Sequence, residues 1–474
     1  MRRFIQTVCV SVAVTSLVAG CDWRKLDQAV ERAPVLSVSP PSGYLGADVG
    51  RLVVALPPPA DKPEVSARYF VASITKVAAA LIELDAQGRP TVYNVPDSIL
   101  GGLNSAIIGS VALASRPDEP FPSVLLGVPE FKTGEFKNGA MFRLRILPGA
   151  AAPTFVLDPA ILPLPGLSPG GATPGSAQTG PFVGYQGFGR GIASGAVAGD
   201  PNFEDWVVVG NAGVSLIEDG AAAVPAVITP ASLCQLDFSP LRLDHLYQLS
   251  RNPAIADIIP SLPGGEIAVG VPNATGPGGG KVVILTREAT GPLGCPITLT
   301  VPGVPGFGSS VVAGDVNGDA AVDLLVGAPL DKVYVFVGPF VPGVVPAPAF
   351  IISAPANAQT ADFGARIALM ELDAVPGPEI LIAAPGFVTG GQAAAGAVFA
   401  FKADGSAFSA LPFTDHNPDA NANLGEGLAV VPFRNPACVA GPSRPLLVAG
   451  ANEEVFAYFQ LPGALPDARC FPAP

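Results

Sequence analysis

Short apolar runs separated by polar turns are the dominant pattern of this chain. In each repeat, three or four apolar residues precede a small residue and then often a proline. Apolar runs of this length bounded by glycine and proline are typical of β-strands. Aligned on their small residues, successive repeats lie 56 to 83 residues apart. The aligned small residues are Ala55, Gly127, Gly210, Gly270, Gly327, Ala383 and Ala449.

A second apolar run, such as KVVIL, KVYVFV or AVFAF, follows each repeat except the first. Two strands joined by a turn cannot protect both of their faces, so several such units must pack together. A closed ring also removes the exposed edge that an open stack would leave. The pattern therefore predicts a ring of β-units. It leaves open whether the first unit forms its own blade or donates a strand that closes the ring against the last blade.

An aromatic residue followed by glycine opens several of these units. Phe307 and Phe363 each lie 20 residues before the small residue of their unit, and Phe188 lies 22 residues before its own. A weaker version, Leu424-Gly425, opens the last unit. The first, second and fourth units lack a clean opener. The opener supports the division into units independently of the strand pattern.

Composition agrees with an all-β fold. The 474 residues include 55 glycines and 53 prolines, which suit short strands and many turns, since proline breaks helices. With 49% hydrophobic residues the chain is not disordered overall. The net charge of −13 comes without clustered lysine or arginine, so we do not expect nucleic acid as a partner.

A short acidic loop follows the opener of the fifth unit. Its candidate ligands occupy loop positions 1, 3, 5, 7 and 9: Asp315, Asn317, Asp319, the backbone carbonyl of Ala321, and Asp323. Oxygen atoms at this spacing can converge on a hard cation such as Ca²⁺. The alternative is an ordinary Asp/Asn/Gly turn between strands. The related stretch DPNFEDW is three residues shorter between its first and last acids and contains Pro201, and DAVPGPE offers too few oxygens, so we expect one calcium site.

The stretch from Phe307-Gly308 through the acidic loop to Gly327-Ala328-Pro329 closely resembles the FG-GAP repeat of integrin α-subunit propellers. The resemblance implies a β-propeller blade with a structural calcium loop between two strands. With seven units, we expect a seven-bladed propeller of four-stranded antiparallel blades. The family usually has glycine at loop position 6, where this chain has Ala320. If this position needs a left-handed backbone, a residue with a Cβ atom there costs about 1–2 kcal/mol, and we then expect weaker calcium binding than is usual.

The amino terminus resembles a bacterial lipoprotein signal. Two arginines precede an apolar run that ends LVAGC, with Cys21 as the residue to be acylated. An ordinary signal peptide cut elsewhere is the alternative. We predict a signal peptide over residues 1–20, a tether over 21–43 and the propeller over 44–474, with a long Pro/Gly/Ala-rich loop at 148–180. The protein would then be lipid-anchored in the cell envelope, on the periplasmic face of either membrane or at the cell surface.

Apart from Cys21 and from Cys9, which lies within the predicted signal peptide, four of the six cysteines remain: Cys234, Cys295, Cys438 and Cys470. An even number in an exported chain predicts two disulfides, for which three pairings are possible. Sequence proximity favours Cys234–Cys295 and Cys438–Cys470.

One motif suggests an enzyme. Ser73 and Lys76 form the S-x-x-K of penicillin-binding proteins and serine β-lactamases, and Lys132-Thr133-Gly134 is also present. The spacing is too short for the domain that those enzymes place between the two motifs, and their middle motif is missing. We therefore predict no enzymatic activity.

The function that best fits these features is binding. A calcium-stabilised ring would present its loops to a protein or a glycan at the cell envelope, although a fold alone does not determine function. The alternatives are a serine hydrolase that uses Ser73 and Lys76, and a purely structural envelope protein.

Overall fold

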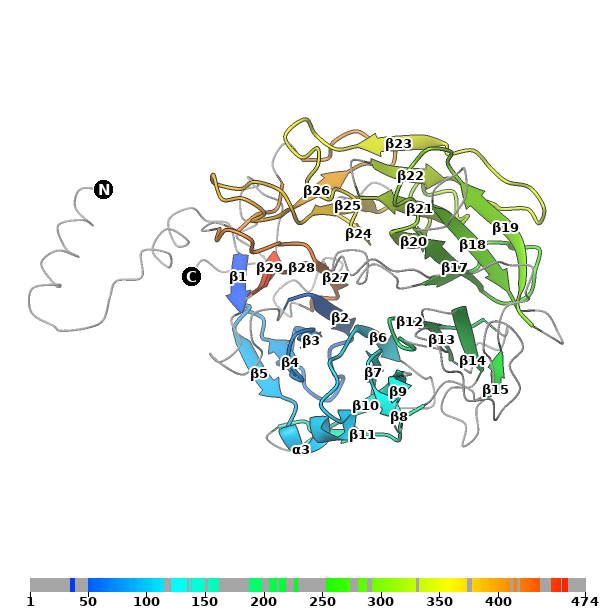
Figure 1. Cartoon of the computed structure of the whole chain (residues 1–474). Helices are drawn as coiled ribbons and strands as arrows, with labels where there is room; N and C mark the ends of the chain where they lie inside the picture. The colour runs from blue at the N-terminus through cyan, green and yellow to red at the C-terminus, as the bar shows by residue number, and fades with distance from the viewer. Residues whose placement is uncertain are drawn as a thin grey trace, which may run out of the picture.

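The fold is seen in a computed structural model (Figure 1). The structure describes residues 35–38, 50–114, 121–133, 136–137, 139–149, 152–161, 187–197, 204–210, 213–218, 226–228, 253–272, 280–287, 292–329, 332–372, 377–409, 412–415, 418–434, 445–452 and 454–458.

Seven antiparallel sheets form the body, and we number them as blades in chain order. Blade 1 contains β2 (Leu52–Leu56), β3 (Ala67–Ala72), β4 (Ala79–Leu84) and β5 (Pro90–Asn94). Blade 2 contains β6 (Ser110–Ala114), β7 (Ser123–Val128), β10 (Ala140–Leu147) and β11 (Thr154–Leu157). Blade 3 contains β12 (Gly191–Gly195), β13 (Asp205–Gly210), β14 (Gly213–Glu218) and β15 (Ala226–Ile228).

The other four blades complete the circle. Blade 4 contains β16 (Ala254–Ala256), β17 (Glu266–Val271), β18 (Lys281–Thr286) and β19 (Gly294–Thr300). Blade 5 contains β20 (Ser310–Gly314), β21 (Asp323–Ala328), β22 (Lys332–Phe336) and β23 (Phe350–Ser353). Blade 6 has β24 (Arg366–Met370), β25 (Glu379–Ala384) and β26 (Ala397–Phe401). Blade 7 has β27 (Gly427–Val431), β28 (Leu446–Gly450), β29 (Val455–Tyr458) and β1 (Val35–Val38).

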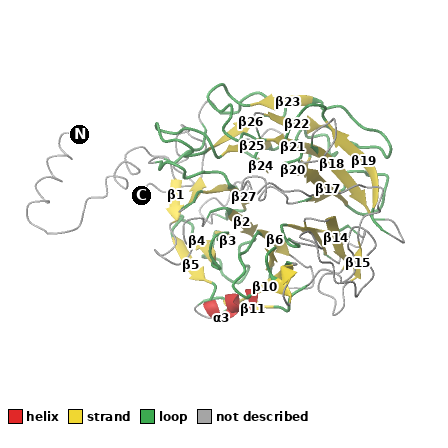
Figure 2. Ribbon diagram, viewed as in Figure 1, coloured by secondary structure: helices red, strands yellow, loops and turns green. Residues whose placement is uncertain are grey.

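Little else in the described part of the chain is regular structure. A hairpin joins β8 (Lys132–Thr133) and β9 (Phe136–Lys137), and a single helical turn, α3 (Asp97–Leu100), runs into a 3₁₀ turn, η1 (Gly101–Leu103) (Figure 2). None of the described helices is long and apolar enough to cross a membrane. The prediction of an all-β, seven-bladed propeller is confirmed, with three described strands in blade 6 and four in each other blade.

The innermost strands close into a ring. Each contacts the next in the order β2, β6, β12, β16, β20, β24, β27, and β27 contacts β2 again. The last blade is completed by β1, which pairs antiparallel with β29, so that Val35 lies opposite Tyr458. A strand from the amino-terminal side therefore does close the ring. It comes from the segment expected to be a tether, so the ring begins at Val35 rather than at residue 44.

The repeated apolar run is the second strand of blades 2 to 7, namely β7, β13, β17, β21, β25 and β28. In the first repeat the alignment is wrong, because Ala55 lies on the innermost strand, β2. By register, the residue of blade 1 that corresponds to Gly327 is Ala72, which pairs with the first residue of β2 as Gly327 pairs with the first residue of β20. This correction makes the spacing between the first two units similar to the others.

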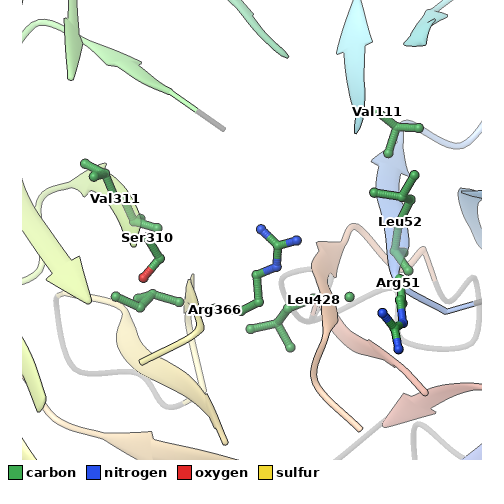
Figure 3. Close-up of a pocket in the computed structure, with 11 residues that line it drawn as sticks. Arg51, Leu52, Val111, Ser310, Val311, Arg366 and Leu428 are labelled. Atoms are coloured by element: carbon green, nitrogen blue, oxygen red, sulfur yellow. The ribbon is translucent and has the colours of Figure 1, made fainter. Parts of the chain in front are cut away.

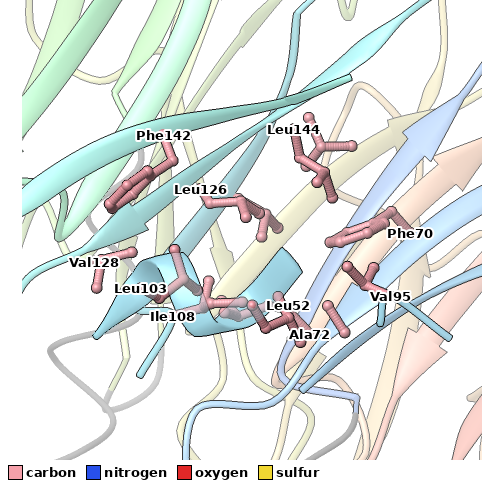
Figure 4. Close-up of a cluster of buried hydrophobic side chains, with 14 of the residues drawn as sticks. Leu52, Phe70, Ala72, Val95, Leu103, Ile108, Leu126, Val128, Phe142 and Leu144 are labelled. Atoms are coloured by element: carbon pink, nitrogen blue, oxygen red, sulfur yellow. The ribbon is translucent and has the colours of Figure 1, made fainter. Parts of the chain in front are cut away.

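The hydrophobic core is divided among the blade interfaces. Each of the seven clusters of buried apolar side chains draws its members from two neighbouring blades. Figure 4 shows the cluster between blades 1 and 2, where Phe70 and Leu52 face Leu126 and Phe142. Because the faces of the middle strands are covered by the blades on either side, β7, β13, β21 and β25 are buried at every position. This explains why their sequences are continuous apolar runs rather than alternating ones.

The aromatic-glycine opener Phe307-Gly308 has a structural role at the interface between blades 4 and 5. Phe307 is fully buried and packs edge-on against Tyr334 and Phe336, with ring centroids 5.5 and 6.1 Å apart. Gly308 has a φ of +92°, which favours glycine. Its N–H donates to the carbonyl of Gly327 in its own blade, and it lies against Gly270 of the preceding blade, where a Cβ atom would overlap the Gly308 carbonyl. The motif therefore joins adjacent blades.

Candidate functional site

The acidic loop connects β20 to β21, and Asp315 organises its first half. The Asp315 carboxylate accepts N–H bonds from Gly318 (2.7 Å), Asp319 (3.1 Å) and Ala320 (2.7 Å). Ala320 has a φ of +68°. Loop position 6 therefore does have a left-handed backbone, and alanine is more strained there than glycine would be.

Asn317 and Asp319 lie side by side on the exposed part of the loop. The Asn317 amide nitrogen donates to Asp319 Oδ2 (2.9 Å), and the Ala321 N–H donates to Asp319 Oδ1 (2.8 Å). The loop thus satisfies several of its own oxygen atoms through backbone and side-chain donors.

Asp323 lies in a different environment, because it is the first residue of β21 and is fully buried. Its two carboxylate oxygens accept N–H bonds from Val316 and Gly338, both at 2.9 Å. Burial raises the pKa of Asp323, the two N–H bonds oppose this, and the negative charges of Asp319 and Asp315 raise it further. The Asp323 carboxylate is therefore close enough to Asp319 and Asp315 for their charges to act on it.

The same buried carboxylate recurs in three other blades. Asp205, Glu266 and Glu379 each begin the second strand of their blade and are at most 4% exposed. Each accepts an N–H bond from the loop that precedes its strand, from Val197, Ile259 and Leu372 respectively. The sequence signal for this feature is an acidic residue directly before the apolar run. From the sequence, we considered such acidic residues only as possible calcium ligands. Since these blades lack the full acidic loop, the carboxylate fastens the loop to its strand without needing a metal.

Whether the loop suits calcium can be judged from its donors and their placement. The side-chain atoms predicted to bind the ion are oxygens, which Ca²⁺ prefers. The negative charges of Asp319 and Asp315 also act on the Asp323 carboxylate, and a bound cation would relieve this repulsion. Among the described residues, however, no group of three or more Asp, Glu, His or Cys side chains is gathered closely enough to hold an ion. The donor chemistry fits calcium, but the carboxylates are not gathered at one point.

The S-x-x-K motif does not form a catalytic arrangement. Ser73 is fully buried, and its Oγ accepts N–H bonds from Thr75 (3.2 Å) and Lys76 (3.1 Å) in a tight turn. Lys76 is exposed. The serine hydroxyl therefore stabilises a turn after β3, and this arrangement gives no support to the hydrolase alternative.

Several predicted sites lie outside the described residues. They are the acylation site Cys21, residues 150–151 and 162–180 of the predicted loop, and the cysteines Cys234, Cys438 and Cys470. The described part of that stretch contains β11, the outer strand of blade 2, so the prediction of a loop is wrong there. Cys295, on β19, is disulfide-bonded, but no described cysteine is its partner. The two pairings stay predictions.

Comparison with known proteins identifies one repeat. A family model of the FG-GAP repeat matches residues 307–336, from the buried opener to the end of β22. A solved structure of BBS1N in complex with ARL6DN, soaked with lead, is similar over 92% of this chain and 100% of that chain, with 12% identity and a TM-score of 0.48. A similarity at this level supports no argument about function. No curated protein matches the chain.

Proposed function

We propose that this seven-bladed β-propeller with an FG-GAP repeat is a lipid-anchored binding module of the cell envelope that presents its loops to a protein partner. FG-GAP propellers are generally not enzymes, which agrees with a binding role. The closed ring and its seven interfacial clusters supply a rigid support for surface loops.

The observation that carries this proposal is an exposed apolar segment on blade 5. Val341, Val344, Val345 and Ile351 lie between the end of β22 and the middle of β23, and each is about half exposed (48–57%). They are four of the five large apolar side chains that stand exposed in the described part of the chain. Exposed apolar groups gathered on one segment are characteristic of protein-binding surfaces. Aliphatic side chains without aromatic rings or hydrogen-bonding groups suit a protein partner better than a glycan.

Site-specific photo-crosslinking in intact source cells tests this proposal. A photoreactive amino acid at Val344 should yield one discrete adduct with an envelope protein. The matched control is Gln87, an exposed position in the turn between β4 and β5 of blade 1, which should yield none. Absence of an adduct at Val344, or the same set of adducts at both positions, would favour a purely structural role.

We further propose that calcium binds the acidic loop through Asp315, Asn317, Asp319, the Ala321 carbonyl and Asp323. The repulsion of the Asp323 carboxylate by Asp319 and Asp315 supports this, because a divalent cation would neutralise it. Because the loop oxygens already accept N–H bonds, binding requires the loop to tighten around the ion. Calcium would then be structural, holding the turn between β20 and β21.

Calorimetry with calcium after chelator treatment tests the metal proposal. The wild type should bind one ion and melt at a higher temperature in calcium than in chelator. A double Asp315→Asn, Asp319→Asn variant should lose both effects. The control is Asp404→Asn, since Asp404 also caps an exposed turn by accepting the Ser406 N–H but has no neighbouring acids in its turn. Equal calcium binding by both variants, or none by the wild type, would contradict the proposal.

The lipid anchor is proposed from the LVAGC sequence alone. If Cys21 is acylated, the protein should partition into the detergent phase of a membrane extract, and Cys21→Ser should move it into the aqueous phase. A wild-type protein found only in the aqueous phase would mean that the signal peptide is cleaved without acylation.

A further inference from the structure

A cavity of about 150 Å³ lies between the innermost strands, on the axis of the ring. Residues of β2, β6, β20, β24 and β27 line it, together with Arg51, which directly precedes β2. Its walls combine aliphatic side chains, Leu52, Val111, Val311 and Leu428 among them, with the polar side chains of Arg51, Ser310 and Arg366 (Figure 3). Neither the opener motif nor the acidic loop contributes to it, so its lining is separate from the features described above.

Two of the lining residues, Arg51 and Arg366, are positively charged. The Arg51 guanidinium forms an ion pair with the Glu426 carboxylate, and it also donates to Asn452 Oδ1 at 3.3 Å. Arg366 differs, because its Nε donates to the backbone carbonyl of Glu426 (2.8 Å) rather than to a carboxylate. Among the described residues that line the cavity there is no aspartate or glutamate. One positive charge therefore remains after Arg51 and Glu426 neutralise each other.

The Arg366 side chain is positioned to use that charge. In Figure 3 its guanidinium extends from β24 into the open space, toward Leu52 and Val111 on the opposite side. The bond from Nε to Glu426 fixes the orientation of the planar group. Within the described part of the chain, the two terminal amino groups make no hydrogen bond or ion pair. Two parallel N–H groups in this arrangement match the two oxygens of a carboxylate.

The buried position of the Arg366 guanidinium makes a positive charge without a counter-ion energetically unfavourable. Burial lowers the pKa of Arg366 to about 10, against the opposing effect of Glu426, so the group is still charged at neutral pH. At this buried position, an attraction between opposite charges is stronger than at the protein surface. A bound anion would remove the imbalance.

We propose that the axial cavity binds a small organic monocarboxylate, with Arg366 as its anchor. The single excess charge matches one carboxylate, whereas a phosphate dianion would be left without compensation. The aliphatic side chains of the walls suit a short apolar tail. The volume of about 150 Å³ is enough for a molecule the size of benzene, so the ligand has roughly six or fewer non-hydrogen atoms. This site is independent of the proposed protein-binding surface on blade 5.

Isothermal titration calorimetry with isobutyrate tests the proposal on the full chain. Saturable binding of isobutyrate is expected. Isobutyramide, which has the same shape without the charge, and inorganic phosphate at the same ionic strength should bind at least about tenfold more weakly, because a charge-assisted hydrogen bond contributes about 1.5–3 kcal/mol. Tight phosphate binding would instead assign the cavity to a general oxyanion.

Variants distinguish the role of Arg366 from a structural one. Arg366→Gln should weaken isobutyrate binding at least about tenfold, and Arg366→Lys should weaken it less, because it keeps the charge without the planar pair of donors. Arg89→Gln removes an exposed arginine that pairs with Asp85 and should leave binding unchanged. Circular dichroism establishes that each variant is folded. Unchanged binding in folded Arg366→Gln, or no saturable binding by the wild type, would overturn the proposal.

Discussion

Glu266 gives the sharpest quantitative test of the buried carboxylates. It begins β17, is 1% exposed, and accepts the Ile259 N–H at 2.8 Å through Oε2. Burial raises its pKa to about 7 from 4.5. The backbone N–H bonds of Ile259 and Ile258 oppose the shift, and the charge of Asp257 adds to it. The folded protein therefore holds a proton at pH values where the unfolded chain has lost it.

The sign of the pH dependence follows from this difference. Below about pH 4.5 both states are protonated, and Glu266 contributes no pH dependence. Between about pH 4.5 and 7 the unfolded chain ionises first, so the free energy of unfolding decreases as the pH rises. Above about pH 7 both states are ionised, and the free energy of unfolding no longer changes with pH through this group. It is then lower than at pH 4.5 by about 3 kcal/mol, at 1.36 kcal/mol for each unit of the pKa difference.

Replacing Glu266 with glutamine removes the ionisation and keeps an oxygen that can accept the Ile259 N–H. We expect Glu266→Gln to be similar to the wild type in stability near pH 4.5 and more stable than it by about 2–3 kcal/mol at pH 8. Urea denaturation followed by circular dichroism at several pH values between 4.5 and 8 measures the difference. Glu64→Gln, at an exposed position, controls for the loss of a carboxylate. A Glu266→Gln difference that stays constant across this range would refute the reasoning.

Three further predictions concern the fold. Ala320→Gly should raise the free energy of unfolding by about 1 kcal/mol, because it relieves a backbone with a φ of +68°; a lower urea midpoint would contradict this. Gly270→Ala should destabilise by at least about 2 kcal/mol or prevent folding, since its methyl group would overlap the Gly308 carbonyl, whereas Gly101→Ala, with open space around it, should fold normally in the same thermal melts. Deleting Val35–Val38 should expose β29 and make blade 7 the first site of limited proteolysis, and an unchanged digestion pattern would show that the ring closes without β1.

Some features of the acidic loop could be predicted from the sequence and others could not. Its position between two strands followed from spacing and from a family resemblance, and it is confirmed. The left-handed conformation of Ala320 was raised only as a condition, and the structure shows that it is met. The burial of Asp323 did not follow, because burial depends on which blade packs against the strand. The structural role of Asp205, Glu266 and Glu379 could not be predicted either, because it also depends on their burial between blades.

The openers show a related limit. We found them where an aromatic residue marks the pair, but blade 2 has only a shifted counterpart, in which buried Ile108 precedes Gly109. Gly109 donates to the Gly127 carbonyl as Ser309 donates to the Gly327 carbonyl, so by register it corresponds to Ser309 rather than to Gly308. An aliphatic residue before glycine is too common in this sequence to be noticed without the contact that gives it meaning.

The strand pattern, the approximate repeat length and the all-β class could be predicted from the residues, because they depend on local backbone preferences and on the burial of short apolar runs. How the ring closes and what lies on its axis could not be predicted in this way. Val35 pairs with Tyr458 across almost the whole chain, and Arg366 meets Leu52 and Val111 in one cavity although they belong to different blades. Such contacts depend on the curvature accumulated over seven packed blades, and no short stretch of sequence contains that information.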